Sequence, residues 1–125
     1  MYENVYQIYI RDLNPTQRIE VEKILNTCDI SWYSFTSRTG MISIILHHKD
    51  ANKGIAIQNV LQSENIQEKD IVIVGDGVND VDSFQINSAY KIAMNHSVPE
   101  LLELADVILE PHQKIEEYLR ERYAL

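Results

Sequence analysis

Residues 71–80 constrain the fold of this chain more than any other segment. The segment opens with an uninterrupted apolar stretch at positions 71–74, without the polar alternation of a half-exposed strand. Such a stretch is typical of a strand covered on both faces, as in a parallel sheet. Gly75 and Gly77 then flank Asp76 in a turn. Because open α/β sheets bind ligands at the carboxyl ends of their strands, we expect a ligand site at this turn.

The acidic side chains of this turn are the first candidates for that site. Asp76 and Asp80 lie one loop apart, and carboxylate oxygens are the ligands that Mg²⁺ prefers. The alternative is an ordinary polar turn in which Asp80 caps the next helix. An isolated Asp-Gly or Asn-Asp pair would favour that alternative. The complete run Gly-Asp-Gly-Val-Asn-Asp after an apolar strand favours the metal site.

The run at positions 75–80 resembles the fourth motif, G-D-x-x-N-D, of the haloacid dehalogenase superfamily of phosphohydrolases. Residues 50–57 are similar to the lysine motif of that superfamily, which its Cof-type sugar-phosphate phosphatases write as K-G-x-A-L. Residues 90–94 are similar to the strand that ends in Ala-Met in the Cof-type branch, and residues 99–106 match the helix leading into A-D-x-V/I. The close resemblance extends from position 50 to about position 110.

Helices and strands alternate after position 50. The expected elements are helices at about 53–64, 79–87, 98–104 and from 113 onward, and strands at 71–74, 90–94 and 106–109. Strands separated by such helices predict a parallel sheet, so the expected fold class is α/β. The resemblance implies that residues 50–125 form the second half of a Rossmann-like catalytic core.

Residues 1–49 have a different pattern, which resembles the closing part of an α/β cap domain. Its expected elements are a strand at 5–10, a helix from Asn14 to about Asn26, strands at 30–36 and 41–47, and a turn at Arg38-Thr39-Gly40. Asn14 is the expected N-cap because Pro15 suits the first helical position. Apolar residues at 19, 21, 24 and 25 predict the buried stripe of this helix.

The resemblance assigns roles to four residues. It implies that Asp76 binds Mg²⁺ and that Asp80 completes or orients the metal shell. Lys53, a catalytic residue together with Asp76, would hold the substrate phosphate beside a nucleophilic carboxylate, and Asn79 would donate its amide to the phosphate or to a loop neighbour. The alternative for Lys53 is a solvated cation in the first turn of a helix, where it opposes the helix dipole. The implied enzyme hydrolyses phosphate monoesters of small metabolites, mainly sugar phosphates, through an aspartyl-phosphate.

The nucleophile motif of the superfamily, D-x-D-x-T/V, is missing from this sequence. The nearest approach is Asp12-Leu13-Asn14, but Asn14 cannot exchange a proton near neutral pH, and Arg11 separates Asp12 from the apolar strand. We therefore predict that the chain alone is inactive. It would be the C-terminal portion of a larger protein, or a shortened relative that pairs with another chain. The missing half or partner would cover the unpaired edge of the strand at 71–74.

Two other interpretations remain open. One is an inactive haloacid dehalogenase-like module that binds a metal, a phosphate or a partner. The other is the phosphorylation domain of a P-type ATPase, although residues 81–84 replace the A-P-A-L of the pumps and no apolar segment is long enough to span a membrane. The chain also departs from the Cof-type pattern A-M-G-N-A, because Asn95 and His96 stand at its Gly and Asn positions.

Composition excludes some classes of function. The net charge of −8, with no basic run, argues against a nucleic-acid-binding surface. The single cysteine, Cys28, excludes an internal disulfide, favours a reducing compartment and is expected to pack beneath a helix. The sequence shows no secretory signal pattern, so we expect a cytoplasmic protein.

Overall fold

The computed structural model describes residues 6–37, 39–111 and 113–124. The chain divides into two compact units, Met1–Asn52 and Lys53–Leu125. The assignment of these units to a cap and a core stays a prediction. Among the described residues, no helix combines the length and the apolar character that crossing a membrane requires.

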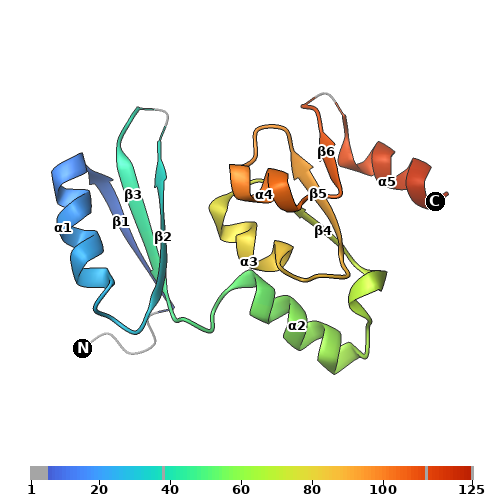
Figure 1. The fold of residues 1–125 in the computed structure, drawn as a ribbon, viewed down its shortest axis with the longest axis horizontal. Coiled ribbons are helices and arrows are strands. Elements are labelled where there is room, and N and C mark those ends of the chain that lie inside the picture. Colours follow the sequence, from blue (N-terminus) through green and yellow to red (C-terminus); the bar gives the residue numbers. More distant parts are fainter. Residues whose placement is uncertain (1–5, 38, 112, 125) are drawn as a thin grey trace. The chain divides into compact units, whose positions relative to one another are not determined.

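The first unit is a three-stranded antiparallel sheet with one helix packed on it (Figure 1). Its elements are β1 (Gln7–Leu13), α1 (Pro15–Leu25), β2 (Ser31–Thr36) and β3 (Ile42–His47), and the strand order is β1-β3-β2. The predicted helix start is confirmed: the Asn14 side chain accepts a hydrogen bond from the Gln17 backbone N–H at 2.9 Å, and the Gln17 side chain accepts one from Asn14 at 3.0 Å. Val5 and Arg38, named in the predicted strand and turn, lie outside the described residues.

The predicted buried stripe of α1 is right only in part. Leu25 is buried and Val21 packs against the core, but Ile19 and Ile24 are 54% and 63% exposed. At about 100° per residue, Val21 and Leu25 share one face of the helix, and Ile19 and Ile24 lie away from it.

The expectation that Cys28 packs beneath a helix is also wrong, because Cys28 follows the last turn of α1 and is exposed.

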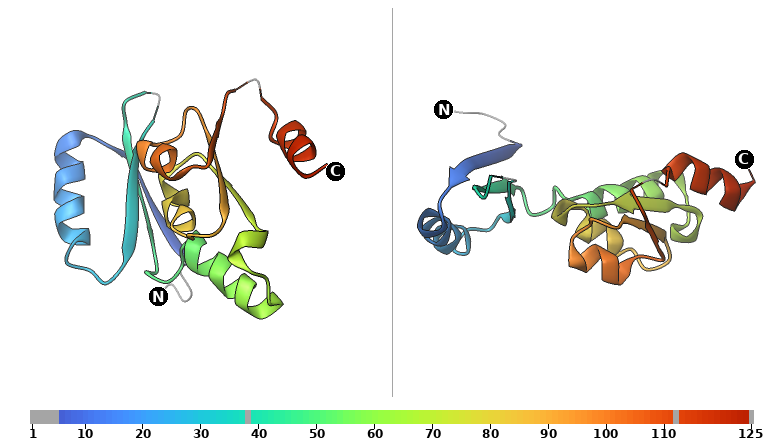
Figure 2. Two further views of the ribbon diagram at one scale, coloured as in Figure 1. Left: turned by 45° about the vertical axis from the view of Figure 1, so that its right-hand side comes forward. Right: turned by 90° about the horizontal axis from the view of Figure 1, so that it is seen from above.

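The second unit contains the predicted parallel sheet (Figure 2). Its elements are α2 (Lys53–Glu64), a 3-10 turn (Glu68–Asp70), β4 (Val72–Gly75), a second 3-10 turn (Val78–Asp80), α3 (Val81–Phe84), β5 (Tyr90–Met94), α4 (Pro99–Leu104), β6 (Val107–Leu109) and α5 (Ile115–Tyr123). The strand order is β4-β5-β6. Figure 2 shows α3 and α4 on one side of this sheet, where Phe84 and Leu101 pack with Ile73 and Ala93.

The helix predicted at 79–87 is much shorter than expected. A 3-10 turn takes residues Val78–Asp80, and α3 ends at Phe84. The chain turns there because Ile86 and Ala89, 4% and 3% exposed, belong to the same core cluster as Phe84. A continued helix would carry these side chains away from the sheet that they cover.

β4 is not covered on both faces, contrary to the prediction from its apolar sequence. Ile73 is 6% exposed, whereas its neighbour Val74 is 39% exposed. Successive side chains of a strand alternate between faces, and the described helices near β4 lie on the face of Ile73. On the other face, α5 reaches β5, where the hydroxyls of Tyr90 and Tyr118 lie 2.7 Å apart. Within the described residues β4 is also an edge strand, as predicted.

Candidate functional site

The predicted site residues of the second unit gather at the carboxyl end of its sheet. β4 ends at Gly75 and leads into the loop that carries Asp76, and β5 ends at Met94 and leads into residues 95–98 (Figure 1). α2 begins at Lys53, whose side chain reaches the same edge. The carboxyl ends of parallel strands are the usual place for a ligand site in such a sheet.

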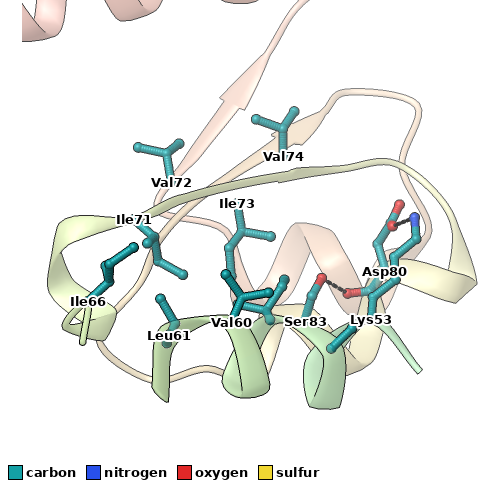
Figure 3. Close-up of a pocket in the computed structure, with 12 residues that line it drawn as sticks. Lys53, Val60, Leu61, Ile66, Ile71, Val72, Ile73, Val74, Asp80 and Ser83 are labelled. Carbon is teal, nitrogen blue, oxygen red and sulfur yellow. Dashed lines mark hydrogen bonds and ion pairs between the residues drawn. The ribbon is translucent and has the colours of Figure 1, made fainter. Parts of the chain in front are cut away.

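Asp80 is buried and its carboxylate accepts hydrogen bonds from three residues, of which Figure 3 draws Lys53. Oδ2 accepts hydrogen bonds from the backbone N–H groups of Asp76 at 3.1 Å and Gly77 at 3.2 Å. Oδ1 accepts one from the ammonium of Lys53, which also forms an ion pair with it. Asp80 therefore does not cap α3 with its side chain, as an ordinary polar turn would. It organises the loop that precedes it.

These contacts fix the charge of Asp80. Burial by itself would raise the pKa of the Asp80 carboxyl. The hydrogen bonds from Lys53, Asp76 and Gly77, together with the positive charge of Lys53, outweigh burial and hold the pKa below its usual value. Asp80 is consequently a buried and ionised carboxylate at neutral pH, and both of its oxygens accept hydrogen bonds.

Two glycines make this arrangement sterically feasible. A Cβ at Gly75 would lie 2.7 Å from the Cβ of Asp80 and 3.0 Å from its Oδ2. A Cβ at Gly54 would lie 2.6 Å from the backbone oxygen of Asp82. Gly54 thus lets the first turn of α2 approach the start of α3, which places Lys53 beside Asp80.

Asp76, in contrast, presents its carboxylate to solvent. Its side chain is 62% exposed, and Nε2 of His96 lies 3.6 Å from its Oδ2. Asn79, the remaining predicted residue, places its Oδ1 only 2.6 Å from the position of a Cβ at Gly77. Within the described ranges, no three His, Cys, Asp or Glu side chains lie close enough to hold a metal ion by themselves.

The loop after β5 is tied to the loop after β4, which the sequence did not reveal. The hydroxyl of Ser97 accepts a hydrogen bond from Met94 N–H at 2.9 Å and donates to the backbone oxygen of Gly75 at 3.3 Å. The N–H of Val98 donates to the backbone oxygen of Asp76 at 3.2 Å. A serine just before a proline-initiated helix is a signal for a local side-chain turn, but not for this contact between loops.

The two residues that depart from the Cof-type pattern face different ways. The amide of Asn95 donates to Glu110 Oε2 at 2.8 Å, and the Asn95 backbone N–H donates to Leu109 O at 2.9 Å, so Asn95 is anchored to the end of β6. His96 contacts Asp76. Of the two replacements, only His96 therefore changes the chemistry beside Asp76.

A groove with a volume of about 480 Å³ lies beside the exposed edge of β4 (Figure 3). Lys53 and Asp80 are at one end of it, and the rest of the lining is mainly apolar and comes mostly from α2, β4 and the segment between them. In Figure 3, Ile71 and Ile73 point toward α2, and Val72 and Val74 point to the opposite side of the strand.

Asp12, predicted from the sequence as the nearest approach to the nucleophile motif, lies in the first unit. It falls in a bulge of β1, where the register with β3 shifts between Ile10 and Leu13. Its φ of 58° is in the left-handed region, and its side chain is exposed. β1 belongs to an antiparallel sheet, whereas the nucleophile of the superfamily follows a strand of the core, so this position does not support Asp12 as a nucleophile.

Comparisons with known proteins identify the family and the fold of this chain. A family model described as haloacid dehalogenase-like hydrolase matches residues 2–116. Phosphoglycolate phosphatase of Methanothermobacter thermautotrophicus is 30% identical over 88 residues, which are 70% of this chain and 37% of that protein. The crystal structure of a haloacid dehalogenase-like hydrolase from Bacteroides thetaiotaomicron has a TM-score of 0.73 at 18% identity, with coverage of 98% of this chain and 46% of that one. A sugar phosphatase of haloacid dehalogenase subclass IIB has a TM-score of 0.65 at 20% identity, with coverage of 98% and 44%. The chain thus spans less than half the length of each.

Proposed function

Because the chain belongs to the haloacid dehalogenase-like hydrolase family, as its motifs predicted, we propose that it is the C-terminal portion of a Mg²⁺-dependent phosphate-monoester hydrolase. The observation that carries this proposal is the contrast between two carboxylates. Asp80 is buried and accepts hydrogen bonds at both carboxylate oxygens, whereas Asp76 is exposed at the carboxyl end of β4. Asp80 therefore organises the loop, and the Asp76 carboxylate remains accessible to a ligand.

Asp76 would hold the magnesium ion. An exposed carboxylate at a sheet edge fits a hard cation that keeps several water ligands, and the substrate or further protein segments would supply the remaining ligands. When bound, Mg²⁺ would neutralise charge on the oxygens of the phosphate. Asp80 would act as the orienting residue, because its hydrogen bonds to the N–H groups of Asp76 and Gly77 fix the backbone from which the Asp76 side chain projects.

Lys53 and Asn79 would bind the phosphate group. Asp80 takes one of the three donors of the Lys53 ammonium, and the Lys53 side chain is 53% exposed. The remaining donors would reach a phosphate oxygen and a nucleophilic carboxylate, which otherwise repel each other. Asn79 folds over Gly77 and would donate its amide to the phosphate or to the loop.

The nucleophile would come from outside these 125 residues, because the full motif D-x-D-x-T/V is missing from the sequence. The strand that carries it would pair with the free edge of β4, supplied by a further segment of the protein or by another chain. That nucleophile would form the aspartyl-phosphate. The relatives include a phosphoglycolate phosphatase and a sugar phosphatase, which supports a small phosphorylated metabolite, most simply a sugar phosphate, as substrate.

The test compares the natural protein that carries these residues with two variants of equal charge change, Asp76→Asn and Asp82→Asn. Asp82 is an exposed carboxylate on the same stretch and serves as the matched control. We expect Mg²⁺-dependent hydrolysis of small sugar phosphates, a loss of at least about 100-fold in kcat/KM for Asp76→Asn, and a change within about twofold for Asp82→Asn. The 125 residues alone should give no turnover of an aryl phosphate.

Each outcome separates the proposal from its alternatives. Loss of hydrolysis in both variants would place the effect in the fold and not at Asp76. A natural protein that binds Mg²⁺ through Asp76 without any hydrolysis would instead be the inactive binding module. Turnover by the 125 residues alone that disappears in Asp76→Ala would overturn the missing-nucleophile interpretation and return Asp12 to consideration.

A further inference from the structure

Among the described residues, His96 is a titratable side chain next to Asp76 that the proposed function does not use. Its Nε2 lies 3.6 Å from Oδ2 of Asp76, and the two side chains are 60% and 62% exposed. This separation is too long for a hydrogen bond, so the contact has no role as a donor–acceptor pair. Imidazole nitrogen is, however, one of the commonest metal ligands in proteins.

The position of His96 is set by contacts on both sides of it in the chain. Before it, Asn95 is anchored to Leu109 and Glu110 at the end of β6. After it, Ser97 is hydrogen-bonded to the backbone oxygen of Gly75, and Val98 donates to the backbone oxygen of Asp76. The loop that carries His96 is therefore tied to the loop that carries Asp76, so the two side chains project from neighbouring backbone positions.

The distance between the two atoms suits two ligands of one cation. With bonds of about 2.1 Å, neighbouring ligands lie ~3.0 Å apart around an octahedral ion and ~3.4 Å apart around a tetrahedral ion. The observed 3.6 Å needs only a small side-chain adjustment to reach either value. Both side chains are solvent-exposed, so such an adjustment meets little resistance from packing.

We propose that His96 Nε2 is a second protein ligand of the cation held by Asp76, and that it shifts the metal preference of the site from Mg²⁺ toward Zn²⁺, Co²⁺ and similar ions. The inference rests on the proposed role of Asp76 as a metal ligand. Carboxylate and water suit Mg²⁺, whereas imidazole suits transition metals. Because the described residues hold no third such ligand nearby, water, substrate or a further protein segment would complete the shell.

The test measures metal binding and not activity. Calorimetric titrations with Mg²⁺, Zn²⁺ and Co²⁺ would compare the natural protein that carries these residues with its His96→Asn, Asp76→Asn and His48→Asn variants. His48 is the matched control, because it is an exposed histidine whose Nδ1 lies 3.7 Å from a carboxylate oxygen of Asp50. Most sites bind Zn²⁺ more tightly than Mg²⁺, so the informative quantity is the change in their affinity ratio on substitution.

We expect His96→Asn to weaken Zn²⁺ and Co²⁺ binding at least tenfold and to change Mg²⁺ binding by less than about twofold. The imidazole nitrogen signals of His96 should shift on addition of Zn²⁺ to the unmodified protein, and His48→Asn should change nothing. Unchanged Zn²⁺ affinity in His96→Asn, or an equal loss for Mg²⁺ and Zn²⁺, would overturn this inference alone. Mg²⁺ binding that survives Asp76→Asn would overturn the proposed function as well.

Discussion

Asp80 is only 5% exposed, so groups inside the protein must compensate its negative charge. Lys53 and two backbone N–H groups do so. Asp80 thus connects three parts of the second unit. The start of α2, the end of β4 and the 3-10 turn before α3 all meet at one side chain. The resemblance implied that Asp80 completes or orients a metal shell, but not that both of its oxygens accept hydrogen bonds from the protein.

The lowered pKa of Asp80 predicts a pH dependence of stability. Because the pKa of Asp80 is lower in the folded state than in the unfolded chain, this carboxylate stabilises the fold above the unfolded pKa of about 4. That contribution is lost as the pH falls below 4 through the folded pKa. In Asp80→Asn, the free energy of unfolding of the second unit should therefore depend less on pH between about 3 and 5.

Urea unfolding at several pH values, followed by the amide signals of β5, would measure this effect. Asp82→Asn removes an exposed carboxylate near Asp80 and should keep the pH dependence of the unmodified chain. If the free energy of unfolding varied equally with pH in the unmodified chain and in Asp80→Asn, the charge of Asp80 would not contribute to stability.

At the scale of elements, the close approach of α2 and α3 predicts an unusual response to a helix-favouring substitution. Replacing glycine by alanine inside a helix normally stabilises it by roughly 0.5–1 kcal/mol. In Gly54→Ala the new methyl group would lie 2.6 Å from the backbone oxygen of Asp82, which cannot move aside like a flexible side chain. We expect the opposite sign, a destabilisation of about 1–3 kcal/mol, because overpacking costs that much.

Thermal unfolding of the second unit, again followed through β5, would give the sign directly. Gln62→Ala tests the same helix at an exposed position and should be neutral or slightly stabilising. A Gly54→Ala variant more stable than the unmodified chain would mean that α2 can shift away from α3 at little cost. Lys53 would then not depend on Gly54 for its position beside Asp80.

Local signals predicted the elements well where a local cause determines them. The start of α1 follows from the reciprocal hydrogen bonds of Asn14 and Gln17, both within one turn. The end of α3 has no such local cause, since it depends on Ile86 and Ala89 packing into a core formed by residues distant in the sequence. For the same reason the sequence placed Asp76 and Asp80 in one loop but missed Ser97, whose contact with Gly75 joins positions 22 apart in the chain.

At the scale of the whole molecule, the exposed edge of β4 is the main unsatisfied feature of the described residues. β4 pairs with β5 on one side only, and Val74 is 39% exposed beside a mainly apolar groove. An apolar edge strand of this kind is a template for pairing with another strand. If the natural partner of β4 is a strand outside these residues, the chain alone should associate through this edge.

We therefore expect the 125 residues to form concentration-dependent oligomers that Val74→Lys reduces, because a lysine ammonium at an edge opposes strand pairing. Ile108→Lys is the matched control, since Ile108 is 45% exposed on β6 at the other edge of the same sheet. Sedimentation velocity over a range of concentrations would measure the effect. Equal loss of association in both variants would point to a general solubility effect of the charge. A monomer at all concentrations would show that β4 needs no further strand, which would remove the main physical reason to expect a missing half.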